Sequence, residues 1–340
     1  MAVKFGKQSY KLSGRIYINE TACIVGPREK EGPLGEYFDQ VEREDYGEDT
    51  WEKGEAHYIE ATFNKLMGKI SLDTKQIDCV FSGDLLNQCM ASAIGLKNSN
   101  VPFLGLYGAC STMAESMLCA SLCMDSNAMT DTIAITSSNF CSAEKQYRFP
   151  LELGGQRTPT SQWTVTASGA VYLSCNKSGA VEELKPYIES VTIGKIENYK
   201  INDVNNMGAV MAPACASTIL SHLRDLSRTP DYYDLILTGD LGYTGSKILL
   251  EIMSMHGNDI STRHNDCGKM IFDSASQDTK SGGSGCGCAA AVFTSYIYKL
   301  LKNLNLRRVL FVATGALISP VMVKQGEDLL AISHGISIEI

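Results

Sequence analysis

One short pattern occurs twice in this sequence, half the chain length apart, and it constrains the fold more than any other feature. IDCVFSGDLLNQ (residues 77–88) and YDLILTGDLGYT (residues 233–244) both have Asp at the second position and a hydroxyl residue followed by Gly-Asp-Leu at the sixth to ninth. The offset between the copies, measured from Asp84 to Asp240, is 240 − 84 = 156 residues. Each copy is typical of a short apolar strand that ends in a polar turn.

The elements around the two copies follow the same order. A segment with apolar residues at helical spacing precedes each copy, at residues 51–70 and at residues 213–233, and we expect the second helix to begin at Pro213. The apolar residues 79–81 and 235–237 then predict strands that are buried on both faces, as in a largely parallel or mixed sheet.

The two halves keep the same order of elements to their ends. Each half has a further helix, a strand at residues 132–136 or 309–313, and a final apolar segment at residues 164–175 or 330–340. Because the offset has grown to 310 − 133 = 177 at these strands, the second half has gained 177 − 156 = 21 residues. The polar stretch 255–278 is the expected place of this insertion.

We therefore predict an α/β protein built from two duplicated halves, with layered mixed sheets and helices. The first half spans residues 1–180 and the second residues 181–340, and we expect them to pack as one body. Sites in such folds lie beyond the ends of strands and at interfaces, so the sequence predicts a site between the halves.

Composition excludes several classes of function. The 340 residues are 44% hydrophobic and 20% charged, which is typical of a folded globular protein, and the net charge of −8 gives no basic surplus for a nucleic-acid face. No segment approaches the roughly 18 apolar residues of a membrane helix, and the basic first residues lack the apolar core of a signal peptide. We expect a cytoplasmic protein without a signal peptide, for which peripheral membrane association is left open.

The cysteines and glycines predict no cofactor. Twelve cysteines are spread over the chain, and neither Cys119/Cys123 nor Cys286/Cys288 has a second pair or a His at the spacing of a zinc site. The glycine-rich SGGSGCG lacks the Lys-Ser/Thr ending of a phosphate-binding loop. We predict reduced, packed cysteines and neither a metal site nor a bound nucleotide.

The stretch GLYGACSTM carries the strongest local signal for chemistry. Residues 104–107 predict a buried strand, the next two a tight turn and Ser111 onward a helix, so that Cys110 lies at a helix entry. Unpaired N–H groups and the positive end of the helix dipole favour a thiolate there. The same geometry suits a nucleophile or, without chemistry, a pocket for an anion.

A duplicated α/β chain with Cys110 in GAC resembles the thiolase and condensing-enzyme superfamily. Over essentially its whole length the chain resembles, more closely, the stage V sporulation protein AD family of spore-forming Firmicutes. Four segments carry this resemblance: ACIVGPREKEGPLGEYFD, GLYGACSTMAESM, NFCSAEKQYRFPLELGGQRTPTSQWTVTASGAVYLS and LTGDLGYTGSKIL.

The resemblance implies a thiolase-like fold that binds dipicolinic acid (pyridine-2,6-dicarboxylate) and is required for its uptake into the developing spore. It also implies that the protein acts together with other proteins of the same sporulation operon, at the forespore or inner spore membrane. It also implies a homodimer paired through first-half strands, near CVFSGDLLNQCMAS.

The resemblance also shows which parts of the condensing machinery are missing. Related condensing enzymes pair the Cys with a His and an Asn, or with two His, from the second half. This chain has Asp240 near the expected place of the His, and KSGGSGCGC, which includes Gly283, where the Asn is expected. An ionised Asp beside Cys110 would disfavour a thiolate and could not donate to an oxyanion. His256 and His264, in the inserted stretch, are the candidates that could restore a base.

A planar ring with two carboxylates requires a helix N-terminus, guanidinium groups and an apolar slot. The helix entry supplies Cys110, Ser111 and Thr112, and the guanidinium candidates are Arg148 and Arg157. The candidates from the second half are Asp240 and Gly283.

Three hypotheses follow from these residues and the resemblance. The first is a non-catalytic dipicolinate-binding protein on a condensing-enzyme scaffold. The second is an active acyl-CoA condensing enzyme or thiolase with Cys110 as the nucleophile. The third is a scaffold with a vestigial pocket that serves contacts with membrane partners. The missing His and Asn favour the first hypothesis over the second.

Overall fold

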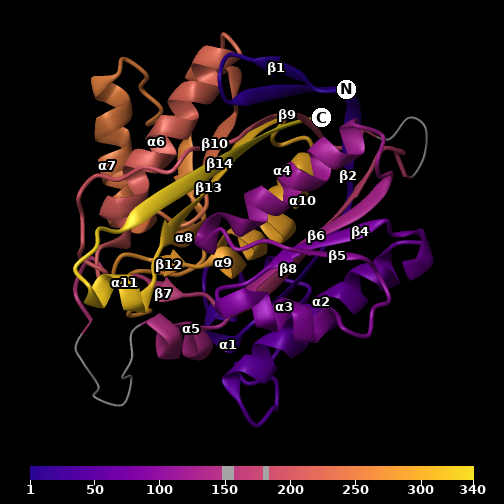
Figure 1. The fold of residues 1–340 in the computed structure, drawn as a ribbon, viewed down its shortest axis with the longest axis horizontal. Coiled ribbons are helices and arrows are strands. Elements are labelled where there is room, and N and C mark those ends of the chain that lie inside the picture. The colour runs from indigo at the N-terminus through magenta and orange to yellow at the C-terminus, as the bar shows by residue number, and fades with distance from the viewer. Residues whose placement is uncertain (148–156, 179–183) are drawn as a thin grey trace.

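The computed structural model describes residues 1–147, 157–178 and 184–340, in which strands and helices alternate along the chain (Figure 1). The strands are β1 (Val3–Phe5), β2 (Ser9–Val25), β3 (Gln40–Val41), β4 (Cys79–Gly83), β5 (Phe103–Gly105), β6 (Asp131–Ser138), β7 (Trp163–Thr164), β8 (Ala167–Ser174), β9 (Tyr187–Thr192), β10 (Leu235–Thr238), β11 (His264–Asp266), β12 (Gly283–Ser284), β13 (Arg308–Leu317) and β14 (Leu330–Glu339). The helices are α1 (Pro27–Lys30), α2 (Trp51–Lys69), α3 (Met90–Leu96), α4 (Thr112–Asp125), α5 (Phe140–Tyr147), α6 (Met207–Asp225), α7 (Gly242–Met255), α8 (Cys267–Met270), α9 (Cys286–Val292), α10 (Tyr298–Lys302) and α11 (Pro320–Lys324). A π-helical turn, η7 (Phe293–Ile297), joins α9 to α10.

The sheet has the same strand order in both directions from its centre. From β2 the order is β8, β6, β4 and β5, and from the neighbouring β9 it is β14, β13, β10 and β11. Strand β4 is parallel to β5 and β6, just as β10 is parallel to β11 and β13, whereas the inner pairs are antiparallel. The two Gly-Asp-Leu copies therefore follow equivalent strands, β4 and β10. The predicted boundary at residue 180 falls between β8 and β9, where residues 179–183 lie outside the described residues.

Strand β2 joins the two half-sheets because its two ends have different neighbours. Residues 9–11 and 16–17 pair with β9, and residues 17–25 pair with β8. Register shifts in both ladders let this long strand pass from one half-sheet to the other. The halves are thus hydrogen-bonded into one body.

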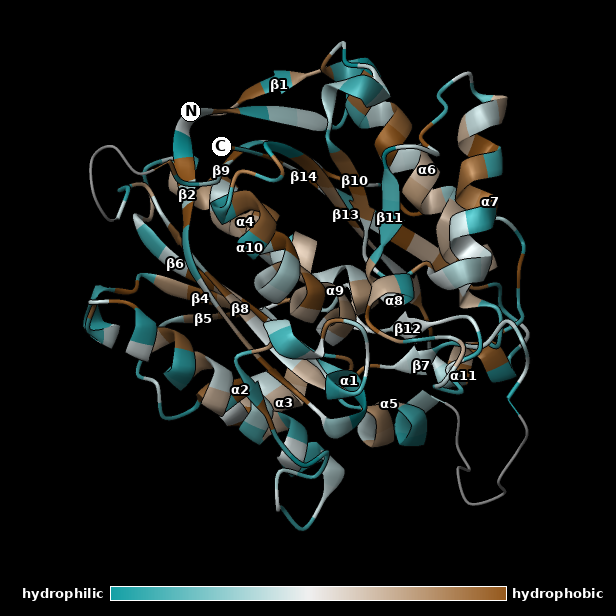
Figure 2. Cartoon of the chain, turned by 180° about the vertical axis from the view of Figure 1, so that it is seen from behind, coloured by the Kyte–Doolittle hydropathy of each residue, from teal (hydrophilic) through white to brown (hydrophobic). Residues whose placement is uncertain are grey.

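Helices and half-sheets form alternating layers. Helices α4 and α9 lie between the half-sheets, with α2 and α3 on one outer face and α6 and α7 on the other (Figure 1). The hydropathy colouring in Figure 2 shows hydrophobic residues along α4, β13 and β14 in the interior and hydrophilic residues on the outer loops. A helix that is buried on all sides is expected to be apolar on all sides, as α4 largely is.

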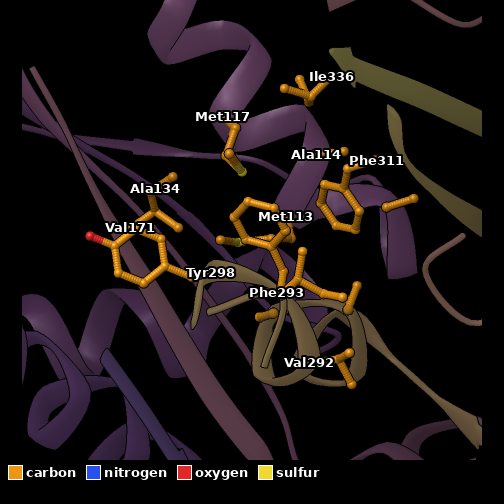
Figure 3. Packing of buried hydrophobic residues seen from close by; sticks show 14 of the residues in the cluster. Met113, Ala114, Met117, Ala134, Val171, Val292, Phe293, Tyr298, Phe311 and Ile336 are labelled. Atoms are coloured by element: carbon orange, nitrogen blue, oxygen red, sulfur yellow. The ribbon is translucent and has the colours of Figure 1, made fainter. Parts of the chain in front are cut away.

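The central core draws its side chains from both halves (Figure 3). Met113 and Met117 of α4 pack near Phe293, which stacks on Phe311 of β13 with ring centroids 4.9 Å apart. Small residues let α9 approach the sheet closely, since a Cβ on Gly169 of β8 would lie 2.8 Å from the carbonyl carbon of Ala290 in α9. This packing fixes where the first turns of α4 and α9 meet.

The helix before the second copy begins at Met207 and not, as predicted, at Pro213. The side chain of Asn206 accepts a hydrogen bond from the N–H of Ala209 and caps the true start. Pro213 lies inside the helix, where it removes one backbone hydrogen bond. Burial of the surrounding helix face against β13 and β14 offsets that loss, which is why proline was a misleading start signal.

The strand predicted over residues 104–107 is wrong in its burial. Strand β5 is short and lies at the edge of the sheet, with Phe103 38% and Leu104 46% exposed. An apolar run indicates a strand but does not show whether another strand will cover it.

The extra residues of the second half are divided among three places. The offset rises from 156 to 264 − 103 = 161 at β5 and β11, to 286 − 112 = 174 at α4 and α9, and to 308 − 131 = 177 at β6 and β13. Most of the gain therefore lies between β11 and α9, where α8 and β12 are found, so the insertion extends beyond the predicted stretch 255–278.

Phe293→Ala should destabilise the protein by about 3–5 kcal/mol, because it opens a cavity among side chains from both halves. Urea denaturation followed by circular dichroism measures the change, with Tyr199→Ala at a 54% exposed position as the control. A loss for Phe293→Ala no larger than that of the control would contradict this account of the core.

Candidate functional site

A cavity of about 250 Å³ lies where the two halves meet. Most of its described lining is apolar. The first half contributes Leu85, Tyr107, Ala109, Cys110, Ala143, Glu144, Tyr147 and Thr164. The second half contributes Val204, Met207, Ser284, Ala316, Leu317, Ile318 and Ser319. The predicted location of a site between the halves thus coincides with a real cavity.

Cys110 and Ser284 face each other across the inner end of this cavity. Cys110 lies in a 3₁₀ turn at the entry to α4, and Ser284 lies just before α9, with Sγ and Oγ 3.8 Å apart. Their separation in sequence, 284 − 110 = 174, equals the offset between the starts of α4 and α9. The two residues are therefore equivalent positions of the duplicated halves, brought together by the packing of the central helices.

Asp240 lies directly behind this pair and is fully buried. Its Oδ2 accepts a hydrogen bond from the N–H of Gly285 at 2.9 Å and one from the hydroxyl of Ser284 at 3.2 Å. Its Oδ1 has no hydrogen-bond partner among the described residues. The carboxyl group thus touches the start of α9 and acts electrostatically on the Cys110 thiol.

Asp84, which is equivalent to Asp240 in the first half, has a different structural role. Asp84 accepts hydrogen bonds from the N–H of Leu86 and from the N–H and hydroxyl of Ser92, so it fixes its own turn. In the second half Asp266 takes over that task, because it accepts from two N–H groups of the turn after β10, at 2.8 and 2.9 Å. Asp240 is therefore not needed to hold this turn, and its carboxyl group instead contacts Ser284 and Gly285.

The structure does not support a thiolate at Cys110, which the helix entry was expected to favour and an ionised Asp240 to disfavour. Burial raises the pKa of the Cys110 thiol well above its usual range, and the negative charge of Asp240 raises it further. The N–H of Gly285 and the hydroxyl of Ser284 lower this pKa, but by less. The expectation from the helix dipole was wrong because it left out desolvation, so the group at the end of the cavity is a neutral thiol.

Burial also raises the pKa of Asp240, to about 7, with the charge of Asp266 as a further cause. The hydrogen bonds from Gly285 and Ser284 and the nearby Cys110 thiol act in the opposite direction. Both protonation states of this carboxyl are therefore accessible near neutral pH.

Ser111 and Thr112 use their hydroxyls within the turn. They donate to the carbonyl oxygens of Gly108 and Ala109, at 2.7 and 2.6 Å, and neither lines the cavity. Gly283 lies in β12, and its carbonyl accepts a hydrogen bond from the side chain of Gln162 at 2.8 Å.

Of the two predicted arginines, Arg157 lies outside the cavity lining. It donates to the backbone carbonyl of Gln162 and lies over the ring of Trp163, 4.8 Å from the centroid. Arg148 lies outside the described residues, directly after the cavity-lining Tyr147. A role of either arginine in ligand binding stays a prediction.

None of the five histidines lines the cavity or forms a hydrogen bond with Cys110. His264 is half-buried, contacts Thr238 Oγ1 at 2.9 Å and has its pKa lowered to about 4 by desolvation. His256 caps the exposed end of α7 and contacts the carbonyl of Ile252. The structure thus places neither histidine of the inserted stretch at the site.

Several lining residues were not among the sequence candidates. Ser284 lies in the stretch KSGGSGCGC and Tyr107 lies three residues before Cys110, so both are neighbours of sequence candidates. Tyr147, whose hydroxyl is 3.1 Å from that of Tyr107, and Glu144 carry no such signal, because only the fold brings α5 to the cavity.

The fold is thiolase-like, as predicted. The structure is similar to that of 3-oxoacyl-[acyl-carrier-protein] synthase III from Aquifex aeolicus VF5, with a TM-score of 0.56 and 11% identity, over 96% of this chain and 100% of that one. It is also similar to cerulenin-bound OleA from Xanthomonas campestris, with a TM-score of 0.57 and 11% identity, over 99% of this chain and 98% of that one. At such low identity these likenesses concern the fold alone.

The chain belongs to the stage V sporulation protein AD family, whose model matches residues 6–339. It is 42% identical over 335 residues to stage V sporulation protein AD of Bacillus subtilis (strain 168), covering 98% of this chain and 97% of that protein. The predicted family is thereby confirmed, and the protein is a sporulation protein. Among the described residues, no helix has the length and apolar character needed to span a membrane.

Asp240→Asn should stabilise the protein increasingly as pH rises from about 4 to about 7. The pKa of Asp240 is raised from 3.8 to about 7 on folding, so the stability that comes with the neutral carboxyl is complete at low pH and lost as pH rises through 7. An amide stays neutral, and the gap above pH 7 should reach roughly 2–4 kcal/mol.

Urea denaturation between pH 4 and pH 8 measures this gap. The matched control is Asp278→Asn, at an exposed carboxyl away from the cavity. Parallel stability curves for wild type and Asp240→Asn would show that Asp240 does not titrate in this range.

Proposed function

We propose that the protein binds dipicolinic acid in the Cys110 cavity and serves its uptake into the developing spore. The observation that carries this proposal is a small, mostly apolar cavity whose inner end holds a neutral thiol, with a carboxyl group in place of a base. Membership of a sporulation family adds the cellular setting.

The cavity suits the proposed ligand in its shape and in the placement of its polar groups. Apolar side chains such as Leu85, Met207 and Ile318 offer walls for a planar ring. The Cys110 thiol and the Ser284 hydroxyl are hydrogen-bond donors at the inner end, and the hydroxyls of Tyr107 and Tyr147 are further polar groups of the lining. The carboxylates of the ligand would meet these polar groups.

Acyl transfer by Cys110 gains no support from the geometry. A thiol nucleophile needs a base within hydrogen-bonding reach or a lowered pKa. Here no histidine contacts Cys110, and burial and Asp240 raise its pKa.

Dimer formation and membrane contacts are further parts of the proposal. Met90 and Ile94 of α3 and Phe103 and Leu104 of β5 form exposed apolar positions at the edge of the first half-sheet. An exposed apolar edge strand favours pairing with a second chain, so we place the homodimer contact there. Peripheral association with the forespore membrane and with proteins of the same operon rests on the family alone.

Ala316→Phe should weaken dipicolinate binding at least tenfold, because Ala316 lines the cavity and a phenyl ring would occupy the space for the ligand. Isothermal titration calorimetry measures the affinity, with Val321→Phe as the control in α11, where Val321 is 64% exposed. Wild-type affinity in Ala316→Phe would place the ligand elsewhere. No heat of binding in the wild type at any pH would overturn the proposed function.

Incubation with an acyl-CoA should leave Cys110 unmodified, since the neutral buried thiol is a poor nucleophile. Intact-mass measurement after incubation tests this, and Cys110→Ala identifies the site of any adduct. A thioester that forms in wild type and is lost in Cys110→Ala would favour the acyltransferase alternative.

A further inference from the structure

Among the described residues, the charged groups at and directly behind the cavity lining are acidic. Glu144 is the one charged side chain among the described lining residues, and no lysine or arginine is among them. Asp240 lies directly behind Cys110 and Ser284, with no cation among its described hydrogen-bond partners. A carboxylate ligand that enters this end of the cavity would face an ionised Asp240 across a region with little water, where like charges repel strongly.

The hydrogen bonds of Asp240 show how this repulsion can be removed. Oδ2 is held by the N–H of Gly285, so it stays an acceptor in either protonation state. Oδ1 is buried without a hydrogen-bond partner among the described residues, an arrangement that is costly for an ionised oxygen and suitable for an O–H. A proton therefore fits on Oδ1 without breaking the contact to α9.

We propose that Asp240 takes up one proton from solvent when a carboxylate ligand binds in the Cys110 cavity, which makes this residue the determinant of ligand charge at the site. With Asp240 neutral, the long 3.2 Å contact from the Ser284 hydroxyl is no longer charge-assisted, and this hydroxyl can turn to the ligand. The Cys110 thiol remains a second neutral donor. This inference rests on the proposed function, because it concerns the ligand proposed for that cavity.

Few other groups near Asp240 compete for the proton. Asp266 is the one other carboxyl among the described residues that acts on Asp240, and it is committed to the hydroxyl of Thr238 and two backbone N–H groups. The lining acid Glu144 faces the cavity from α5. The cysteines near Asp240 are neutral because burial raises the pKa of each of them. They are Cys110 in the turn before α4, Cys215 in α6, Cys267 in α8 and Cys288 in α9.

The sign of the pH dependence follows from the position of the charge. A bound carboxylate raises the pKa of a neighbouring acid, so the complex holds the proton to a higher pH than the free protein does. The pKa of Asp240 in the free protein is about 7. Below that pH affinity should be constant, and above it affinity should fall by about tenfold per pH unit, the slope for one linked proton.

Calorimetric titration with dipicolinate between about pH 6 and pH 8.5, in two buffers with different ionisation enthalpies, tests the proposal. The wild type should take up close to one proton per ligand above pH 7 and weaken as stated. Asp240→Asn should bind with the wild-type affinity of pH 6 at every pH and take up no proton. Asp278→Asn, at an exposed carboxyl, should behave as wild type.

A second measurement keeps the proposal testable if Asp240→Asn folds poorly. Infrared difference spectra of the wild type at pH 8 should show the C=O stretch of a protonated carboxyl appearing when dipicolinate is added. Binding without proton uptake, or the wild-type slope in Asp240→Asn, would overturn this inference and leave the proposed function standing. Loss of proton uptake in Glu144→Gln would also overturn it, because the proton would then belong to Glu144, whereas no binding at any pH would end both proposals.

Discussion

The contact between the first turns of α4 and α9 is the constraint on which the rest of the site depends. These helices lie between the half-sheets, and their packing brings Cys110 within 3.8 Å of its repeat equivalent Ser284. The N–H of Gly285 then binds Asp240, so a buried carboxyl is held at the meeting point of both halves. Two chemical properties of the cavity end follow from this arrangement: the neutral thiol and the raised pKa of Asp240.

Duplication explains how one sequence pattern can serve two purposes. A Gly-Asp turn after a parallel strand needs an acceptor for its backbone N–H groups, and Asp84 supplies one in the first half. In the second half Asp266, at the end of β11, binds the equivalent turn, whereas the equivalent end of β5 has Gly105, which has no side chain to do so. Asp240 therefore does not have to bind the N–H groups of its own turn. Asp266 affects the site in this way although it does not line the cavity.

Local patterns were sufficient to predict much of this structure, and their limits are physical. The apolar runs at β4, β6, β10 and β13 predicted these strands, and the repeat predicted equivalent strands in the two halves. Strand β5 was mistaken for buried, and the desolvation of Cys110 was left out, because burial depends on residues distant in sequence. The effect of Asp240, 240 − 110 = 130 residues after Cys110, was expected only through the family resemblance, which placed this carboxyl beside the thiol.

The side chain at position 240 determines whether the Cys110 thiol can lose its proton. A histidine in the place of Asp240 could accept the thiol proton and leave an imidazolium that stabilises the thiolate. A carboxyl group cannot do this here: when ionised it raises the pKa of the thiol, and when neutral it already carries a proton. The thiol therefore stays protonated in either state of Asp240. The same carboxyl, once protonated, would tolerate an incoming anion that its ionised form would repel, so under the proposed function the feature that weakens nucleophilic chemistry also permits binding.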